Sequence, residues 1–501
     1  MKYSMRTNSP VVVSWLRRLV FISLTMVVLA GCPPQQVNVP DVVGLILTNA
    51  EAVIGNAGLS VGNVEEQYSE TAPEGEVISQ DPAAGAEVDP ETAVDLVISS
   101  GMEDTGLAKV DGTRLLIDGS EYRAIGINMP HLSQAYNGTW HHWDEIYGTR
   151  ERMKESIVEA LEDAAAHDIA FIRFFAMPGY PKGKAELYDV NREAYWEAMD
   201  EVFELCRGHG IRLMPVLGVA GWHWAYGEPA QAHLDPDSRT YQAMREYIHD
   251  FVTRYKGDPV VLMWSLQNEL FLKADVDMAG NPGLPRGVYP DDFPYEIRET
   301  QTQEDTLSFD MILDLYEEWT AYIKSLDPGR LVTSGDAGVR QESVSRRKAV
   351  AEALDQGTWP PDYRFRKDTL DEHRAHLVES QAPVDVASIH AYVELEAPGE
   401  GDNLAEGLDS IPYQRERVRA LHDANQPVLV GEFGQRPFFH EDPSAEPALA
   451  AIDMFEEEGV ALIAIWVWHF PWQDADWNIP SGASQPALME RIAEFNAKYA
   501  H

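Results

Sequence analysis

Cysteine and positive charge are scarce in this sequence. Only two cysteines, Cys32 and Cys206, occur in 501 residues, so the fold cannot rest on a disulfide framework. Lysine and arginine total 39 against 82 aspartates and glutamates, which gives a formal net charge of −43. A field of that sign repels polyanions, and we therefore expect neither nucleic acid nor an anionic lipid surface as a partner.

Apolar runs long enough to span a membrane, which takes roughly 20 residues, are also lacking. The apolar segment LVFISLTMVVLAG follows Arg17-Arg18 and ends in small residues before Cys32, the plan of an export signal over residues 1–31. LAGC resembles the lipobox of bacterial lipoproteins, in which the cysteine becomes the lipid-bearing first residue. The resemblance implies an extracytoplasmic protein, anchored through Cys32 to a bacterial membrane at the cell surface or in the periplasm. An uncleaved anchor is the alternative, and it leads to the same side of the membrane.

A small α+β unit is predicted over residues 37–101. It contains one short helical pattern, Ala50 to Ala57, stopped by Gly58, and then strand-like alternation broken by prolines and glycines. The VPDVVG opening, the GLSVG turn and the run VISQDPAAGAEV resemble a PASTA domain. The resemblance implies either contact with peptidoglycan fragments or a role as a spacer.

A polar linker at 102–108 precedes a large domain over 109–501. That domain opens with a hairpin pattern, with Asp-Gly turns at 111–112 and 118–119. Strand and helix patterns then alternate to the end of the chain, as in repeated βαβ units.

Eight nearly continuous apolar strands in this region predict a parallel sheet buried on both faces. No GxGxxG or phosphate-binding loop follows the first of them, which disfavours a doubly wound open sheet. The fold class predicted is therefore an α/β (β/α)8 TIM barrel with a small N-terminal PASTA-like domain. The expected strands are 122–129, 169–177, 211–219, 260–269, 331–335, 385–392, 427–433 and 461–470.

Polar side chains end several of these strands, where a TIM barrel carries its chemistry. The apolar stretch LMWSLQNEL (262–270) finishes on Asn268-Glu269, and Glu432 ends the seventh strand. Two such carboxylates suit a retaining glycosidase, in which one protonates the leaving oxygen and the other, about 5–5.5 Å away, attacks the sugar carbon. The acid has to keep its proton while the nucleophile stays ionised. The other strand-end candidates are Arg173, His390, Tyr392, Trp466 and Trp468.

Each of these candidates has a structural alternative. Arg173 and Tyr392 are suitable partners for an ionised Glu432, although Arg173 could equally clamp a carboxylate structurally, and His390 alone could be a core histidine. Asn268 can hydrogen-bond a sugar 2-hydroxyl. The remaining aromatic candidates offer either sugar stacking or loop packing, and strand alternation places the two tryptophans near residue 467 on one face. They are Trp222, Trp224, Trp466 and Trp468.

The ordered set resembles glycoside hydrolase clan A, and most closely family 5, over roughly residues 107–500. The resemblance implies that Glu269 is the acid/base and Glu432 the nucleophile. It implies substrate-binding roles for the remaining members, which are Asn268, Arg173, the pair His390 and Tyr392, and Trp468 or Trp466.

Two departures from the family pattern bear on the substrate. Leu270 stands where the family usually has proline, and the third strand ends in VLGVAG without the histidine of many family cellulases, with His223 a few residues on. The leucine indicates an atypical subfamily, and the missing histidine favours a mannanase-like relative over a cellulase. The expected activity is thus endo-hydrolysis of a β-1,4-linked polysaccharide, β-mannan before β-glucan.

Other readings remain open at this stage. The barrel could be a non-catalytic carbohydrate-binding module of a cell-wall lipoprotein, or an enzyme directed to a cell-wall glycan by the small domain. No His, Cys and Asp cluster has catalytic-zinc spacing, and the sequence predicts no metal and no cofactor.

The lipobox resemblance predicts that Cys32 carries the lipid. Metabolic labelling with palmitate should mark the wild-type protein and leave Cys32→Ser unlabelled. Equal labelling of the two proteins would contradict the prediction.

Overall fold

The chain divides into two compact units, residues 1–103 and 104–501. Cys32 and the expected export segment lie outside the described residues, and within the described part no helix combines the length and apolarity needed to cross a bilayer. Side chains of residues 224 and 225 are not described. The computed structural model describes residues 36–69, 72–73, 75–100, 106–136, 144–176, 188, 191–276, 302–358, 366–394, 411–473 and 476–500.

One helix packs against a three-stranded sheet in the first unit. Helix α1 (Leu47–Asn56) buries Ala50 and Ile54, and the chain then turns at Gly58, whose φ is 75°. The sheet has the order β2-β5-β3, and its central strand buries every second residue, as a sheet covered on one face requires. The strands are β1 (Val37–Asn38), β2 (Ser60–Gln67), β3 (Val77–Asp81), β4 (Glu87–Val88) and β5 (Ala93–Ser99).

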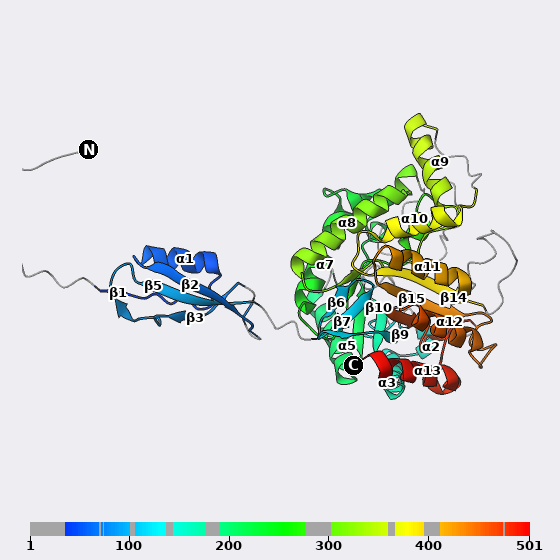
Figure 1. Cartoon of the computed structure of the whole chain (residues 1–501), viewed down its shortest axis with the longest axis horizontal. Coiled ribbons are helices and arrows are strands. Elements are labelled where there is room, and N and C mark those ends of the chain that lie inside the picture. Colours follow the sequence, from blue (N-terminus) through cyan, green and yellow to red (C-terminus); the bar gives the residue numbers. More distant parts are fainter. Residues whose placement is uncertain are drawn as a thin grey trace, which may run out of the picture. The chain divides into compact units, whose positions relative to one another are not determined.

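A (β/α)8 barrel forms the second unit, as predicted (Figure 1). Each strand is parallel to its neighbours, and a bridge between Thr333 and Val386 joins the two strands at the ends of the sheet order. The strands are β9 (Ala124–Asn128), β10 (Phe171–Phe175), β11 (Arg212–Val216), β12 (Trp264–Ser265), β13 (Val332–Thr333), β14 (Ala387–Val393), β15 (Val428–Gln435) and β16 (Leu462–Ile465).

Helices surround the strands, and several of them begin at a side-chain cap (Figure 1). Thr149, Asn191, Ser238, Ser308 and Thr369 each accept a hydrogen bond from the backbone N–H three residues on, which satisfies a donor that the helix itself leaves unpaired. The helices are α2 (Asp144–Tyr147), α3 (Arg150–Ala166), α5 (Arg192–Gly208), α6 (His223–Tyr226), α7 (Arg239–Tyr255), α8 (Phe309–Leu326), α9 (Ser343–Gln356), α10 (Leu370–Gln381), α11 (Ile411–Asp423), α12 (Glu446–Glu457) and α13 (Pro486–Tyr499).

The predicted hairpin closes the amino-terminal end of the barrel. Its strands are β6 (Ala108–Asp111), β7 (Arg114–Ile117) and β8 (Ser120–Glu121), and the second turn has φ values of 49° at Asp118 and 79° at Gly119. Positive φ at both positions is what a tight type I′ turn needs. Leu115 and Ile117 are buried in one apolar cluster with residues from the barrel strands. This end of the barrel is therefore a packed floor.

Strands four, five and eight are shorter than predicted: β12 is Trp264–Ser265, β13 is Val332–Thr333, and β16 ends at Ile465. After β12 the chain reaches Glu269, whose φ is 55°, and after β13 it reaches Gly335, whose φ is 73°. A Cβ atom at Gly335 would lie 2.0 Å from the carbonyl oxygen of Gln267. Only glycine allows these two strand ends to approach so closely.

The packed floor predicts a stability test with a built-in control. Leu115→Ala should lower the free energy of unfolding of the barrel by about 2–5 kcal/mol, since it leaves a cavity among fully buried side chains. Deleting residues 33–102 should leave that transition unchanged, because the hairpin belongs to the barrel unit. Residues 37–101 contain no tryptophan, so tryptophan fluorescence during urea unfolding reports on the barrel alone. A large loss of stability on deletion would show that the first unit supports the barrel.

Candidate active site

Polar side chains from several barrel strands converge at the carboxyl end of the barrel. Their interactions link residues far apart in the chain into one hydrogen-bonded group, most of it buried. The members of this group that the sequence predicted are Arg173, Asn268, Glu269, His390, Tyr392 and Glu432.

Glu432 lies on β15 and is almost wholly enclosed, with 5% of its side chain exposed. One carboxylate oxygen accepts a hydrogen bond of 2.5 Å from the Tyr392 hydroxyl, and the other lies 3.4 Å from a guanidinium nitrogen of Arg173. Burial, and then the charge of Glu432, raise the pKa of Tyr392 well above its ordinary value. The phenol thus keeps its proton and remains a donor to the carboxylate.

Arg173 is fully buried, and it connects the ends of several strands. One terminal nitrogen donates to Asn128 Oδ1 at 3.0 Å in addition to Glu432, and the other donates to Asn268 Oδ1 at 2.6 Å and to the Gly335 carbonyl at 3.2 Å. Burial lowers the pKa of Arg173 while the charge of Glu432 opposes that shift, and the guanidinium stays protonated. A fixed positive charge therefore lies beside the buried carboxylate.

The two asparagines are oriented by this guanidinium. Because Asn268 Oδ1 accepts from Arg173, its amide nitrogen is left as a donor toward a ligand. Asn128, at the end of β9, was not singled out from the sequence. It accepts from Arg173 and donates to the carbonyls of Gly431 and Ala464 at 2.9 and 3.1 Å. Its position as a polar residue near the end of the first expected strand, 122–129, could have identified it as a site residue.

Glu269 is more open than Glu432, with 36% of its side chain exposed. Its backbone is left-handed, and one carboxylate oxygen lies 3.0 Å from His390 Nδ1. Burial raises the pKa of Glu269, but the hydrogen bond and charge of His390 and the charge of Arg173 outweigh it, so the pKa lies below its ordinary value. The expectation that this acid keeps its proton is not met in the ligand-free site.

The separation of the two carboxylates is the geometric key to the site. One oxygen of Glu269, one oxygen of Glu432 and a nitrogen of His390 all lie within 4.8 Å of one another. Carboxyl groups are about 5–5.5 Å apart in retaining glycosidases and about 6.5–9.5 Å apart in inverting ones, which need room for a water. An approach this close between single oxygens is compatible with the shorter of these two separations.

The same three groups could in principle ligate a metal ion. Glu432, however, already accepts from Tyr392 on one oxygen and faces the Arg173 guanidinium with the other. A cation entering here would displace those donors and meet a buried positive charge. The electrostatics favour two carboxylates, each held by neighbouring hydrogen-bond donors, over a metal centre.

Two of the tryptophan candidates are enclosed by packing. Trp468 is fully buried and its indole N–H donates to the Ala160 carbonyl on α3, so it packs between the barrel and a helix. Trp222 is 1% exposed and donates to the Gly218 carbonyl, which makes it a core residue of its loop. Stacking on a sugar is excluded for both by burial. The shared face expected for Trp466 and Trp468 fails because β16 ends at Ile465, before either residue.

The other residues of the loop after strand three are arranged around a buried histidine. His223 is half-buried on α6, and its ring meets that of His233 edge-on at 4.9 Å. His233 Nε2 accepts from the backbone N–H of Gly221 and of Trp222. Burial lowers the pKa of His233 to about 4, which keeps it neutral in this role. The Trp224 side chain lies outside the described residues.

Three other tryptophans follow β16, and one of them contacts a hydrogen-bond partner of Glu432. Trp466, the first residue after β16, is half-buried and donates to Gln473 Oε1 at 2.7 Å. Trp477 meets the ring of Tyr392 with centroids 4.6 Å apart, and Trp472 is 63% exposed on the short turn Pro471–Gln473. Trp472 and Trp477 carry no strand pattern, which is why sequence reasoning missed them.

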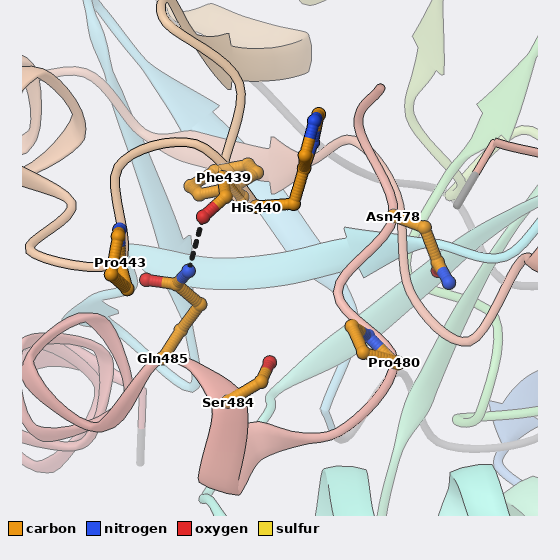
Figure 2. A pocket seen from close by; sticks show the side chains of 7 residues that line it. All are labelled: Phe439, His440, Pro443, Asn478, Pro480, Ser484 and Gln485. Atoms are coloured by element: carbon orange, nitrogen blue, oxygen red, sulfur yellow. Dashed lines mark hydrogen bonds between the residues drawn. The ribbon is translucent and has the colours of Figure 1, made fainter. Parts of the chain in front are cut away.

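A hollow of about 340 Å³ lies between the loops that follow β15 and β16 (Figure 2). Its polar side chains are engaged by hydrogen bonds within and between these two loops. Gln485 donates to the Phe439 carbonyl, Ser484 donates to the Ser481 carbonyl, and Asn478 accepts from the Phe470 N–H. The lining contains neither carboxylate of the pair, and we regard this hollow as loop structure rather than as part of the catalytic centre.

Comparison with known proteins supports two separate likenesses. Residues 37–100 match the PASTA domain family. Mannan endo-1,4-beta-mannosidase 5 of Solanum lycopersicum is 23% identical over 366 residues, 68% of this chain and 73% of the relative. Mannan endo-1,4-beta-mannosidase 8 of Oryza sativa is 25% identical over 357 residues, 66% of this chain and 79% of the relative.

A solved mannanase structure resembles the barrel, and a kinase resembles the small first unit. The endo-1,4-beta-mannanase from Rhizomucor miehei has a TM-score of 0.50 at 18% identity and covers 78% of this chain and 99% of its own, which shows the shared barrel fold. A probable serine/threonine-protein kinase of Lactococcus lactis is 41% identical over 71 residues, only 14% of this chain and 11% of the kinase. That likeness concerns one small module.

The buried guanidinium predicts a large effect on stability. Arg173→Met should lower the free energy of unfolding by about 3–5 kcal/mol, since it leaves Glu432 as a buried charge without its cation. Arg152→Met is the matched control, because Arg152 pairs with Glu155 and Glu159 on an exposed helix face and should leave the urea midpoint unchanged. Equal midpoints for the two variants would contradict the account of the site.

Proposed function

We propose that the barrel is a retaining endo-β-1,4-glycosidase with β-mannan as its favoured substrate and β-glucan next. The observation that carries the proposal is the pair Glu269 and Glu432, whose oxygens approach within 4.8 Å in contrasting surroundings. The names of the mannan-cleaving relatives support the choice of sugar.

In the first step, Glu432 attacks the anomeric carbon while Glu269 passes its proton to the leaving glycosidic oxygen. Arg173 and Tyr392 stabilise Glu432 as an anion, and its enclosure keeps water from competing with it. A sugar lying over Glu269 covers the exposed third of that side chain and strengthens the burial that raises its pKa. The protonated acid is therefore favoured once substrate is bound.

In the second step, Glu269 removes a proton from a water molecule, which attacks the anomeric carbon and releases Glu432. The glycosyl ester formed on Glu432 carries no charge, so a negative charge within 4.8 Å of Glu269 has disappeared. Losing a like charge lowers the pKa of Glu269 and makes it the base that this step needs. The Asn268 amide is placed to hold the sugar 2-hydroxyl through both steps.

We further propose an extracytoplasmic location, with the first unit bound to peptidoglycan or acting as a spacer between a lipid anchor at Cys32 and the barrel. The PASTA match and the likeness to a module of a kinase support this placement. A non-catalytic carbohydrate-binding barrel is the competing function. The hydrogen bonding of both glutamates favours the enzyme.

Release of reducing ends and their stereochemistry test the proposal together. The protein should release reducing sugar from mannan faster than from cellulose, xylan or peptidoglycan, and proton NMR should show the β-anomer first, since two inversions give retention. Glu432→Ala should stop turnover, and azide should restore it with an inverted glycosyl azide. Glu269→Ala should spare the first step on an activated aryl glycoside, which needs no proton. A first-formed α-anomer would overturn the mechanism, and no release from any polysaccharide would favour the binding module.

A further inference from the structure

A buried carboxyl group lies behind the acid/base and outside the group of side chains that would touch the sugar. Asp336 follows β13 and is fully buried. One of its oxygens accepts the backbone N–H of Phe271 at 2.9 Å, and the other accepts the hydroxyl of Tyr316 on α8. Neither partner is one of the proposed catalytic residues, so Asp336 acts on the segment that follows Glu269.

That segment is a single 3-10 turn, Leu270–Lys273, and Glu269 is its N-cap residue. The first N–H groups of such a turn have no partner within it, and the side chain of the N-cap residue usually accepts one of them. The side chain of Glu269 does not do so, and one of its oxygens lies near His390 instead. The carboxylate of Asp336 accepts the N–H of Phe271, the second residue of the turn, in its place.

The ring of Phe271 ties the same turn to α8 by packing. It lies 4.9 Å from the ring of Phe309 and 5.5 Å from that of Tyr316, with the second pair perpendicular. At the start of α8 the arrangement repeats, because Asp275 accepts the Phe309 N–H at 3.2 Å. Two buried aspartates thus hold the backbone N–H groups of two phenylalanines whose rings pack together, one in the turn and one at the start of α8.

We propose that Asp336 is a positioning residue that caps the turn after Glu269 and so frees the Glu269 side chain for proton transfer. This inference rests on the proposed acid/base role of Glu269. Burial raises the pKa of Asp336 to about 6, against the opposing hydrogen bonds from Tyr316 and Phe271. Above that pH it is ionised, and an ionised acceptor binds a backbone N–H more strongly than a neutral one does.

Removing the Asp336 carboxylate should affect activity in the same way as a partial loss of proton transfer by Glu269. In the full-length protein, Asp336→Ala removes the acceptor, and a misplaced Glu269 should lower kcat/KM about tenfold or more on a manno-oligosaccharide, whose leaving group needs a proton. On a dinitrophenyl glycoside, whose leaving group needs none, the fall should stay below about twofold. Asp336→Asn keeps an acceptor oxygen at the same place and should restore most of the activity on the oligosaccharide.

Tyr316→Phe is the matched control, since it removes the other partner of Asp336 and keeps the cap. It should show no dependence on the leaving group, and thermal unfolding of all three variants separates a folding defect from a local one. An equal loss on both substrates in Asp336→Ala, or no loss on either, would overturn the inference. If Glu269→Ala itself lacked the leaving-group dependence, the proposed function would fail instead.

A second measurement needs no substrate. Amide hydrogen exchange at residues 270–273 should be much faster in Asp336→Ala than in the wild type, and Asp336→Asn should keep its protection. Unchanged protection in Asp336→Ala would show that the N–H of Phe271 does not depend on this carboxylate, and the cap would then be ruled out whatever the activity of the enzyme.

Discussion

The site depends on the hydrogen bonds of the buried Arg173 guanidinium. It touches Asn128 at the end of the first strand, Asn268 after the fourth, Gly335 after the fifth and Glu432 on the seventh. A planar fork of donors fixes all these groups relative to one another, which a lysine ammonium could not do. The close approach at Gly335 is a condition of this arrangement, because any side chain there would collide with the end of strand four.

Sequence patterns could predict the barrel and most residues around this guanidinium, since both depend on short-range regularities. Apolar strands ending in polar groups mark the carboxyl end of a barrel, and that signal located Arg173, Asn268 and Glu432. The same reasoning misplaced Trp468, because alternation holds only while the chain stays in the ladder and β16 ends at Ile465. The sequence left Trp222 open between sugar stacking and loop packing, and its indole is enclosed by packing that no local pattern encodes.

The surroundings of the two glutamates differ, and they are likewise not local in sequence. Glu432 has its cation and phenol donors built in, whereas Glu269 has His390 and an open side. For Glu269, burial raises the pKa, and the hydrogen bond and charge of His390 and the charge of Arg173 outweigh it. Any group that covered the exposed third of this side chain would strengthen the burial and raise the pKa.

Several buried polar atoms beneath the carboxylates lack a hydrogen-bond partner among the described residues, including Arg173 Nε, His390 Nε2 and Ser388 Oγ. Such atoms reduce stability, because each has given up water without a full replacement. The opposite end of the same barrel is apolar and sealed by the hairpin that carries Leu115 and Ile117. Burial of that floor stabilises the barrel and so offsets what the polar end loses. The hairpin lies at the opposite end of the barrel from the carboxylates, and it contributes to the site by stabilising the strands that carry those carboxylates.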